Sequence, residues 1–154
     1  MADGPSKKRV AAFTIAIGRV LGRSVQDIKT TATAALLRDY KVDSIPDVSE
    51  IVAAQRESYD GTGPKGLKGD DIPLGARILR FANALDALLA GRPPLGGNER
   101  RYYRAVPISE AKERIQLASG TAFDPKIVNA FLEMSDWLWA ELIHDLPTLP
   151  GFDE

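Results

Sequence analysis

Apolar residues recur every three or four positions along most of the chain, and this spacing constrains the fold more than any other feature. Val10, Phe13, Ile17 and Leu21 share one face of a predicted first helix. No segment alternates apolar and polar residues as a half-buried strand does. The pattern therefore predicts an all-α fold, a single helical domain of about six helices.

Capping residues predict where several of these helices begin. Ser24 is a suitable N-cap for a second helix, and Ser49 for a short third helix that ends near Tyr59. Pro73 suits the first turn of a fourth helix, after a glycine-rich loop. Asp124-Pro125 is a cap followed by proline at the first helical position, and predicts that the longest and last helix begins there.

Composition limits the classes of function. The chain of 154 residues fits one domain, and we expect a flexible tail over 1–7, the helical domain over 8–146 and a second tail over 147–154. Twenty basic residues against 21 acidic ones give a net charge of −1, which argues against nucleic acid and membrane partners. The absence of cysteine excludes disulfides and thiolate metal sites and favours a cytoplasmic location. His144, the single histidine, is expected to be a solvated residue rather than a catalytic base.

Two motifs resemble those of a known family. The stretch YDGTGPKGLKGDDIPLGARI over residues 59–78 looks like the signature loop of HD-GYP domains, and ASGTAFDP over 118–125 resembles their AGTQFDP motif. Ala35-Leu-Leu-Arg-Asp39 stands where that family carries LLHDIGK. The resemblance implies a helical fold of the HD-domain type. It also implies a family that hydrolyses cyclic di-GMP at a centre of two or three metal ions.

The sequence departs from the family at the positions where the resemblance implies metal ligands. The histidine of the HD pair is replaced while its aspartate is kept, both histidines of the HHE motif are replaced while its glutamate is kept, and a further aspartate is replaced by asparagine. These positions are Arg38, Asp39, Gln55, Arg56, Glu57 and Asn83. Arginine has no lone pair to give to a cation. We therefore expect that the metals are lost, that no cofactor is bound and that the chain is not an enzyme.

An alternative keeps a metal without histidine. Asp39, Glu57, Asp60 and Asp86 could hold magnesium through oxygen ligands. Against it stand the nearby arginines, with which these carboxylates are expected to form ion pairs instead.

Three hypotheses for function follow. The first is a catalytically inactive signalling domain in a bacterial pathway that acts through a protein partner or a homodimer, with Trp137 or Trp139 at the interface. The second is a cyclic di-GMP receptor that uses Lys65, Lys68 and Arg77. The third is a residual phosphodiesterase that relies on carboxylates alone. Arg100-Arg-Tyr-Tyr-Arg104 could serve single-stranded nucleic acid but is more typical of a surface loop.

Overall fold

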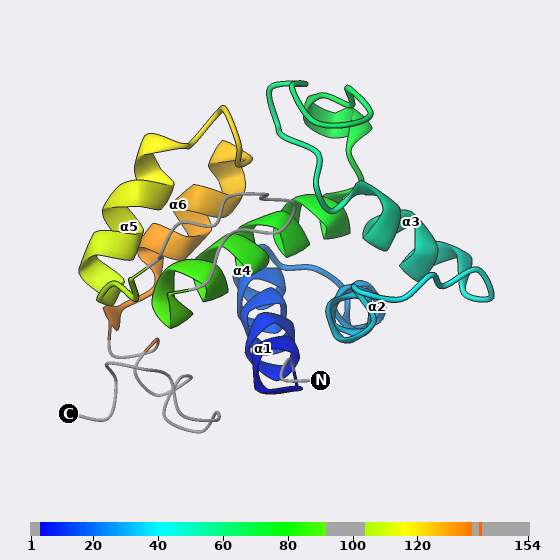
Figure 1. Cartoon of the computed structure of the whole chain (residues 1–154), viewed down its shortest axis with the longest axis horizontal. Coiled ribbons are helices and arrows are strands. Elements are labelled where there is room, and N and C mark those ends of the chain that lie inside the picture. Colours follow the sequence, from blue (N-terminus) through cyan, green and yellow to red (C-terminus); the bar gives the residue numbers. More distant parts are fainter. Residues whose placement is uncertain (1–3, 92–103, 137–138, 140–154) are drawn as a thin grey trace.

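The chain folds into helices, as the periodicity predicted. The computed structural model describes residues 4–91, 104–136 and 139, and within these ranges there are six α-helices and no strand beyond isolated bridges (Figure 1). The helices are α1 (Gly4–Val20), α2 (Val25–Leu36), α3 (Pro46–Ala54), α4 (Leu74–Ala90), α5 (Ile108–Leu117) and α6 (Pro125–Glu133), with the 3-10 helix η1 (Gly69–Asp71) before α4. None of the described helices has the length and hydrophobicity needed to cross a bilayer.

Helix α4 lies at the centre of the domain. It packs against all five of the other α-helices, with α2 and α3 toward one end and α5 and α6 toward the other (Figure 1). Leu79, Phe81, Leu85 and Leu89 of this helix are fully buried. Burying such side chains stabilises the fold by about 1.5–3 kcal/mol each, so α4 holds the two groups of helices in one core.

Aromatic rings connect the two sides of this core. Trp139 lies edge-on against Phe13 of α1 and Phe131 of α6, with ring centroids 5.5 and 5.2 Å apart. Phe131 in turn meets Phe81 of α4 at 5.0 Å. Trp139 is fully buried, so of the two tryptophans predicted for an interface it is the one that packs in the core. Trp137 lies outside the described residues.

Two predicted caps are confirmed and one is wrong. The side chain of Ser24 accepts a hydrogen bond from the backbone N–H of Asp27, and that of Asp124 accepts one from Lys126. Helix α3, however, begins at Pro46 and ends at Ala54, so Ser49 lies within it. Proline already has the backbone angle of a first helical residue and lacks the N–H that would be left unpaired there.

The last helix is shorter than predicted. Helix α6 has nine residues, whereas α1 and α4 have 17 each. Met134 after it is extended, with ψ of 131°. Beyond it the carbonyl of Ser135 accepts a hydrogen bond from the N–H of Trp139. Serine and aspartate at 135–136 are residues that favour helix starts, so the chain leaves one helix and begins another turn here.

The first helix begins earlier than predicted. Helix α1 starts at Gly4, so residues 4–7 belong to the helix and not to a flexible tail. Pro5 falls in the first turn, where proline is favoured. Ser6 is 4% exposed, and a buried polar residue at this point fixes the first turn against the rest of the domain.

The two motifs that carry the family resemblance lie side by side. The backbone N–H groups of Tyr59 and Asp60 donate to the carbonyls of Ala122 and Thr121 at 3.3 and 3.0 Å. Across the glycine-rich loop, which we define as residues 60–73, Asp60 pairs with Lys68 in an antiparallel bridge. These backbone hydrogen bonds hold the loop against the turn before α6.

The aromatic core provides a test of this packing. Phe131→Ala should lower the free energy of unfolding by about 3–5 kcal/mol, because it leaves a cavity beside Phe81 and Trp139. Leu117→Ala is the matched control, since Leu117 is 85% exposed and its truncation should change stability by less than about 0.5 kcal/mol. Urea denaturation followed by circular dichroism measures both. Equal losses in the two variants would contradict this description of the core.

Candidate functional site

A buried carboxylate on α4 is linked to some of the positions where the resemblance implies metal ligands. Asp86 is 0% exposed. The Nε of Arg9 donates to its Oδ1 at 2.6 Å, and the hydroxyl of Ser6 donates to its Oδ2 at 2.6 Å. The Arg9 side chain is itself 6% exposed. A buried charge is tolerated only when it is paired and hydrogen-bonded, and both oxygens of Asp86 meet that condition.

Three of the positions where ligands were expected join this carboxylate through hydrogen bonds. Arg38 donates from Nη2 to the Ser6 hydroxyl at 3.0 Å. Gln55 donates from Nε2 to the backbone carbonyl of Arg38 at 3.0 Å, and Asn83 donates from Nδ2 to Oε1 of Gln55 at 3.1 Å. All three residues are buried. We call Ser6, Arg9, Arg38, Gln55, Asn83 and Asp86 the buried polar network.

The other expected positions lie apart from this network. Asp39 is exposed and pairs with Lys7 at 3.4 Å. Arg56 is also exposed. The expected ion pairs of Arg38 and Arg56 with Asp39, Glu57 or Asp60 are not among the salt bridges found between the described residues.

Glu57 holds the glycine-rich loop in place. Its side chain is nearly fully buried. Its two oxygens accept hydrogen bonds from the backbone N–H of Lys65, at 2.9 and 3.2 Å, and Oε1 accepts another from Leu67 at 3.0 Å. Gly63 passes so close that a Cβ there would lie 2.7 Å from the Cα of Glu57. The carboxylate and this glycine together fix the path of the loop.

Charged groups around the loop have defined partners. Burial lowers the pKa of Arg80, an effect that the charge of Glu57 opposes. The hydroxyl and backbone N–H of Thr62 both donate to Asp60, and they hold the pKa of that carboxyl below its usual value. Lys65 and Lys68 keep their side chains exposed.

Arg77 is occupied within the protein. Its Nη1 donates to Asp124 at 2.7 Å and lies 3.4 Å from Asp70, while its Nε donates to the carbonyl of Ile72. Asp124 is buried and also caps α6. Arg77 therefore joins the loop to the start of α6, which argues against the predicted ligand contact from this residue.

Within the described residues the donor set does not fit a metal centre, since no three histidine, aspartate or glutamate side chains there converge on a point where they could hold a cation. The four carboxylates of the magnesium alternative are engaged separately, by Lys7, by the loop backbone, by Thr62 and by Arg9. His144 and residues 100–103 lie outside the described part of the chain.

Sequence reasoning missed two members of the network. The predicted tail over residues 1–7 includes Ser6, and no role was predicted for Arg9. A signal was present, because Ser6 stands four residues before Val10 and Arg9 four residues before Phe13, on the apolar face of α1. Polar residues on the buried face of a helix indicate a buried partner.

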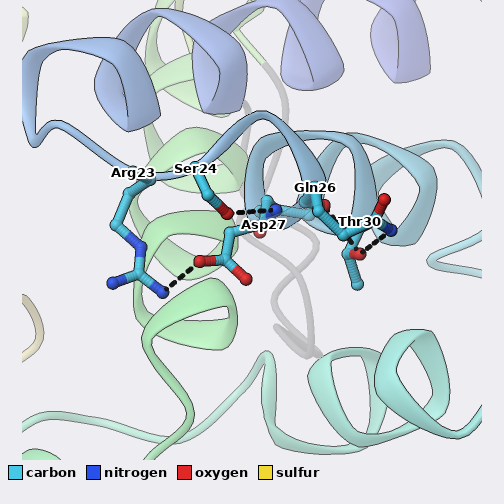
Figure 2. A network of polar contacts seen from close by, with 6 residues as sticks. Arg23, Ser24, Gln26, Asp27 and Thr30 are labelled. Atoms are coloured by element: carbon cyan, nitrogen blue, oxygen red, sulfur yellow. Dashed lines mark hydrogen bonds and ion pairs between the residues drawn. The ribbon is translucent and has the colours of Figure 1, made fainter.

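A cavity of about 270 Å³ lies apart from the network. It is bounded by side chains from α1, α2, α3 and the start of α4, and includes none of the network residues. The pair of Arg23 and Asp27 lies on its wall, beside the N-cap Ser24 (Figure 2). The predicted site residues are likewise absent from its lining.

Comparison with known proteins identifies the family of the chain. A model of the HD domain matches residues 23–127, which is more than half of the chain. The chain belongs to the HD-domain family. The match spans α2 through the start of α6. It therefore includes the glycine-rich loop and the network residues that lie on α4.

Relatives of this chain are named as phosphodiesterases of cyclic dinucleotides. The chain is 44% identical over 84 residues to a probable cyclic di-GMP phosphodiesterase of Vibrio cholerae, and the match covers 54% of this chain and 17% of that protein. It is 34% identical over 87 residues to a cyclic di-GMP phosphodiesterase of Thermotoga maritima, covering 56% of this chain and 22% of that protein. A 3'3'-cGAMP-specific phosphodiesterase of V. cholerae is 35% identical over 102 residues, or 66% of this chain and 17% of that protein.

These relatives correct one prediction and support another. They confirm the HD-GYP-like type of HD domain. The prediction that the chain is not an enzyme is overturned, because relatives of 34–44% identity are named phosphodiesterases and belong to an enzyme family. The chain spans about a fifth of the length of the curated relatives it matches.

Glu57 offers a test of how the loop is held. Glu57→Gln should lower the free energy of unfolding by about 1–3 kcal/mol, because a charged acceptor of several backbone hydrogen bonds becomes a neutral one. Lys65→Ala is the control: Lys65 contributes its backbone N–H to this contact, so the change should cost less than about 0.5 kcal/mol. Hydrogen exchange at the Lys65 and Leu67 amides should accelerate in Glu57→Gln alone. Unchanged exchange would contradict the role of Glu57.

Proposed function

We propose that this HD domain binds a cyclic dinucleotide on the face formed by the glycine-rich loop. The observation that supports the proposal is the presentation of Lys65 and Lys68, whose side chains are exposed while their backbone is held by Glu57 and by the bridge to Asp60. Ammonium groups on a fixed backbone bind phosphate at a lower cost in entropy than lysines on a loose loop.

The surroundings of the loop favour a ligand with two phosphates. Lys65 and Lys68 stand three residues apart in the sequence, and their charges are not engaged in any ion pair found between the described residues. Asp70 on the same loop lies 3.4 Å from Arg77, so its charge is partly offset. The relatives' names mention both cyclic di-GMP and 3'3'-cGAMP, and each of these ligands carries two phosphodiesters. The proposal is therefore for the cyclic dinucleotide class, without a choice of base.

Titration calorimetry of the full chain with cyclic di-GMP and with 3'3'-cGAMP tests this proposal. We expect binding that weakens at least about tenfold in the double variant Lys65→Glu, Lys68→Glu, since two favourable charges become repulsive. The control is Lys29→Glu, Lys126→Glu, which reverses two exposed lysines on α2 and α6 and should leave the affinity unchanged. Absence of binding to both nucleotides would contradict the proposal.

The same mixtures answer the question of hydrolysis. Product analysis with and without Mn²⁺ shows whether a bound nucleotide is cleaved. Metal-dependent cleavage that Glu57→Ala abolishes would assign hydrolysis to this domain. The proposal of binding is independent of that outcome, because it depends on calorimetry alone.

A second proposal concerns protein contacts, and exposed apolar side chains favour it. We propose that the domain also associates with a second copy or a protein partner through Leu36, Tyr40 and Ile45, which are 44%, 58% and 45% exposed. These residues lie on the last turn of α2 and the connection to α3. The three residues are near one another in the sequence, and exposed apolar side chains that form one contiguous patch are a frequent basis for association.

Sedimentation of the full chain tests the case of a second copy. We expect a concentration-dependent dimer that Tyr40→Ser with Ile45→Ser converts to monomer, since the lost apolar area no longer drives association. Leu117→Ser, at an exposed position of α5, is the control and should not change the sedimentation. A monomer at all concentrations would contradict self-association and direct the search to a different protein.

A further inference from the structure

The buried polar network connects helices that are far apart in the sequence. Ser6 and Arg9 come from α1, Arg38 follows α2, Gln55 follows α3, and Asn83 and Asp86 come from α4. The hydrogen bond of Ser6 to Asp86 joins residues 80 positions apart, and that of Arg9 to Asp86 joins residues 77 apart. The network therefore crosslinks four segments around one buried charge.

The guanidinium groups of the network supply the positive charge that a bound cation would otherwise bring to Asp86. Asp86 has no exposure to solvent, so its negative charge requires a positive partner inside the protein. The guanidinium of Arg9 meets one oxygen at 2.6 Å, and the Ser6 hydroxyl meets the other while accepting a hydrogen bond from Arg38. The Arg9 guanidinium thus contacts the Asp86 carboxylate directly, and the Arg38 guanidinium is connected to the same carboxylate through the Ser6 hydroxyl.

We propose that this network takes the structural place of a metal centre: guanidinium groups act as the cations that hold α1 and the ends of α2 and α3 on α4. The domain then folds and keeps its glycine-rich loop in position without a divalent ion. The donor set supports this, because the Arg9 guanidinium that pairs with Asp86 has no lone pair to give to a metal, and the Ser6 hydroxyl oxygen already accepts a hydrogen bond from Arg38. Divalent ions are excluded by the positive charge already present.

The misfit with a metal is independent of the proposed nucleotide binding. A ligand on Lys65 and Lys68 contacts the loop, whereas the network lies under α1 and has its own partners. The two proposals can fail separately. Calorimetry with nucleotide tests one, and stability in the presence and absence of metal tests the other.

The first experiment measures thermal unfolding of the full chain with EDTA, with Mn²⁺ and with Mg²⁺. We expect the same Tm in all three conditions, because the fold gains nothing from a bound ion. A Tm that falls with EDTA and returns with Mn²⁺ would overturn the proposal. So would a saturable rise in Tm on titration with Mn²⁺.

The second experiment tests whether the pair of Arg9 and Asp86 stabilises the fold. Arg9→Met and Asp86→Asn, alone and together, form a double-mutant cycle measured by urea denaturation. Each single change should raise the unfolding equilibrium constant at least about a hundredfold, since it leaves a buried charge or carboxamide unmatched. The double change should cost less than the sum of the two.

An exposed ion pair of similar geometry is the matched control. Arg23 and Asp27 are 2.9 Å apart, with side chains 38% and 51% exposed (Figure 2). The cycle Arg23→Met with Asp27→Asn should change the unfolding constant less than about fivefold at each step. Equal coupling in the buried and exposed pairs would overturn the proposal.

If Asp86→Asn does not fold, a milder variant tests the same role. Ser6→Ala removes the hydroxyl that connects Arg38 to Asp86 and leaves the Arg9 contact intact. Hydrogen exchange should accelerate along α1 in this variant while α5 keeps the rate of the unchanged protein, because the network holds α1 and includes no residue of α5. Uniform acceleration in both helices, or none in α1, would contradict the assigned role.

Discussion

One buried carboxylate, Asp86, sets requirements that much of the surrounding structure meets. A fully buried charge must find its donors within reach, and on the side facing α1 only the first two turns of that helix supply them, as Ser6 and Arg9. This requirement explains why the chain is already helical at Gly4. It also explains the position of α1, which packs on both α2 and α4 with its apolar residues Phe13 and Ile17 in the same core. The polar and apolar faces of α4 therefore act together: Leu85 and Leu89 provide the burial, and Asp86 fixes which helix covers it.

A second carboxylate organises the other side of the domain by a different means. Glu57 bonds to backbone N–H groups rather than to side chains, so what it fixes is the path of the glycine-rich loop and not a pair of helices. That loop is held at its other edge by backbone hydrogen bonds to the turn at Thr121 and by Arg77, which reaches Asp124. The two family motifs, 40 or more positions apart in the sequence, are thus parts of one structural unit. Exposed lysines on such a unit have a defined position, and this property makes them suited to a ligand of fixed geometry.

The helices were predictable from the sequence because periodicity and capping are local. Ser24 and Asp124 were identified correctly, since an N-cap bonds a backbone N–H only two or three residues away. The third helix was misplaced because two local signals compete there, and Pro46 prevails over Ser49. The site was less predictable for a physical reason: the partner of Asp86 is 77 residues away, and no local pattern pairs them. Family resemblance indicated which positions, such as Arg38 and Asn83, would meet, but the donor that neutralises the charge, Arg9, lies outside every motif.

Three of the replaced ligand positions, Arg38, Gln55 and Asn83, are linked by hydrogen bonds. Here Asn83 donates to Gln55, Gln55 donates to the Arg38 backbone, and Arg38 donates to Ser6, so one chain of hydrogen bonds leads to Asp86. Of the asparagine, only Oδ1 lacks a hydrogen-bond partner in the described part of the chain. The contact of Asn83 depends on the Gln55 side chain, whereas Gln55 itself bonds to a backbone carbonyl that any residue at position 38 keeps. A single histidine restored at position 38 would therefore remove only the guanidinium that donates to Ser6, and with Arg9 still paired to Asp86 it would not by itself build a metal site.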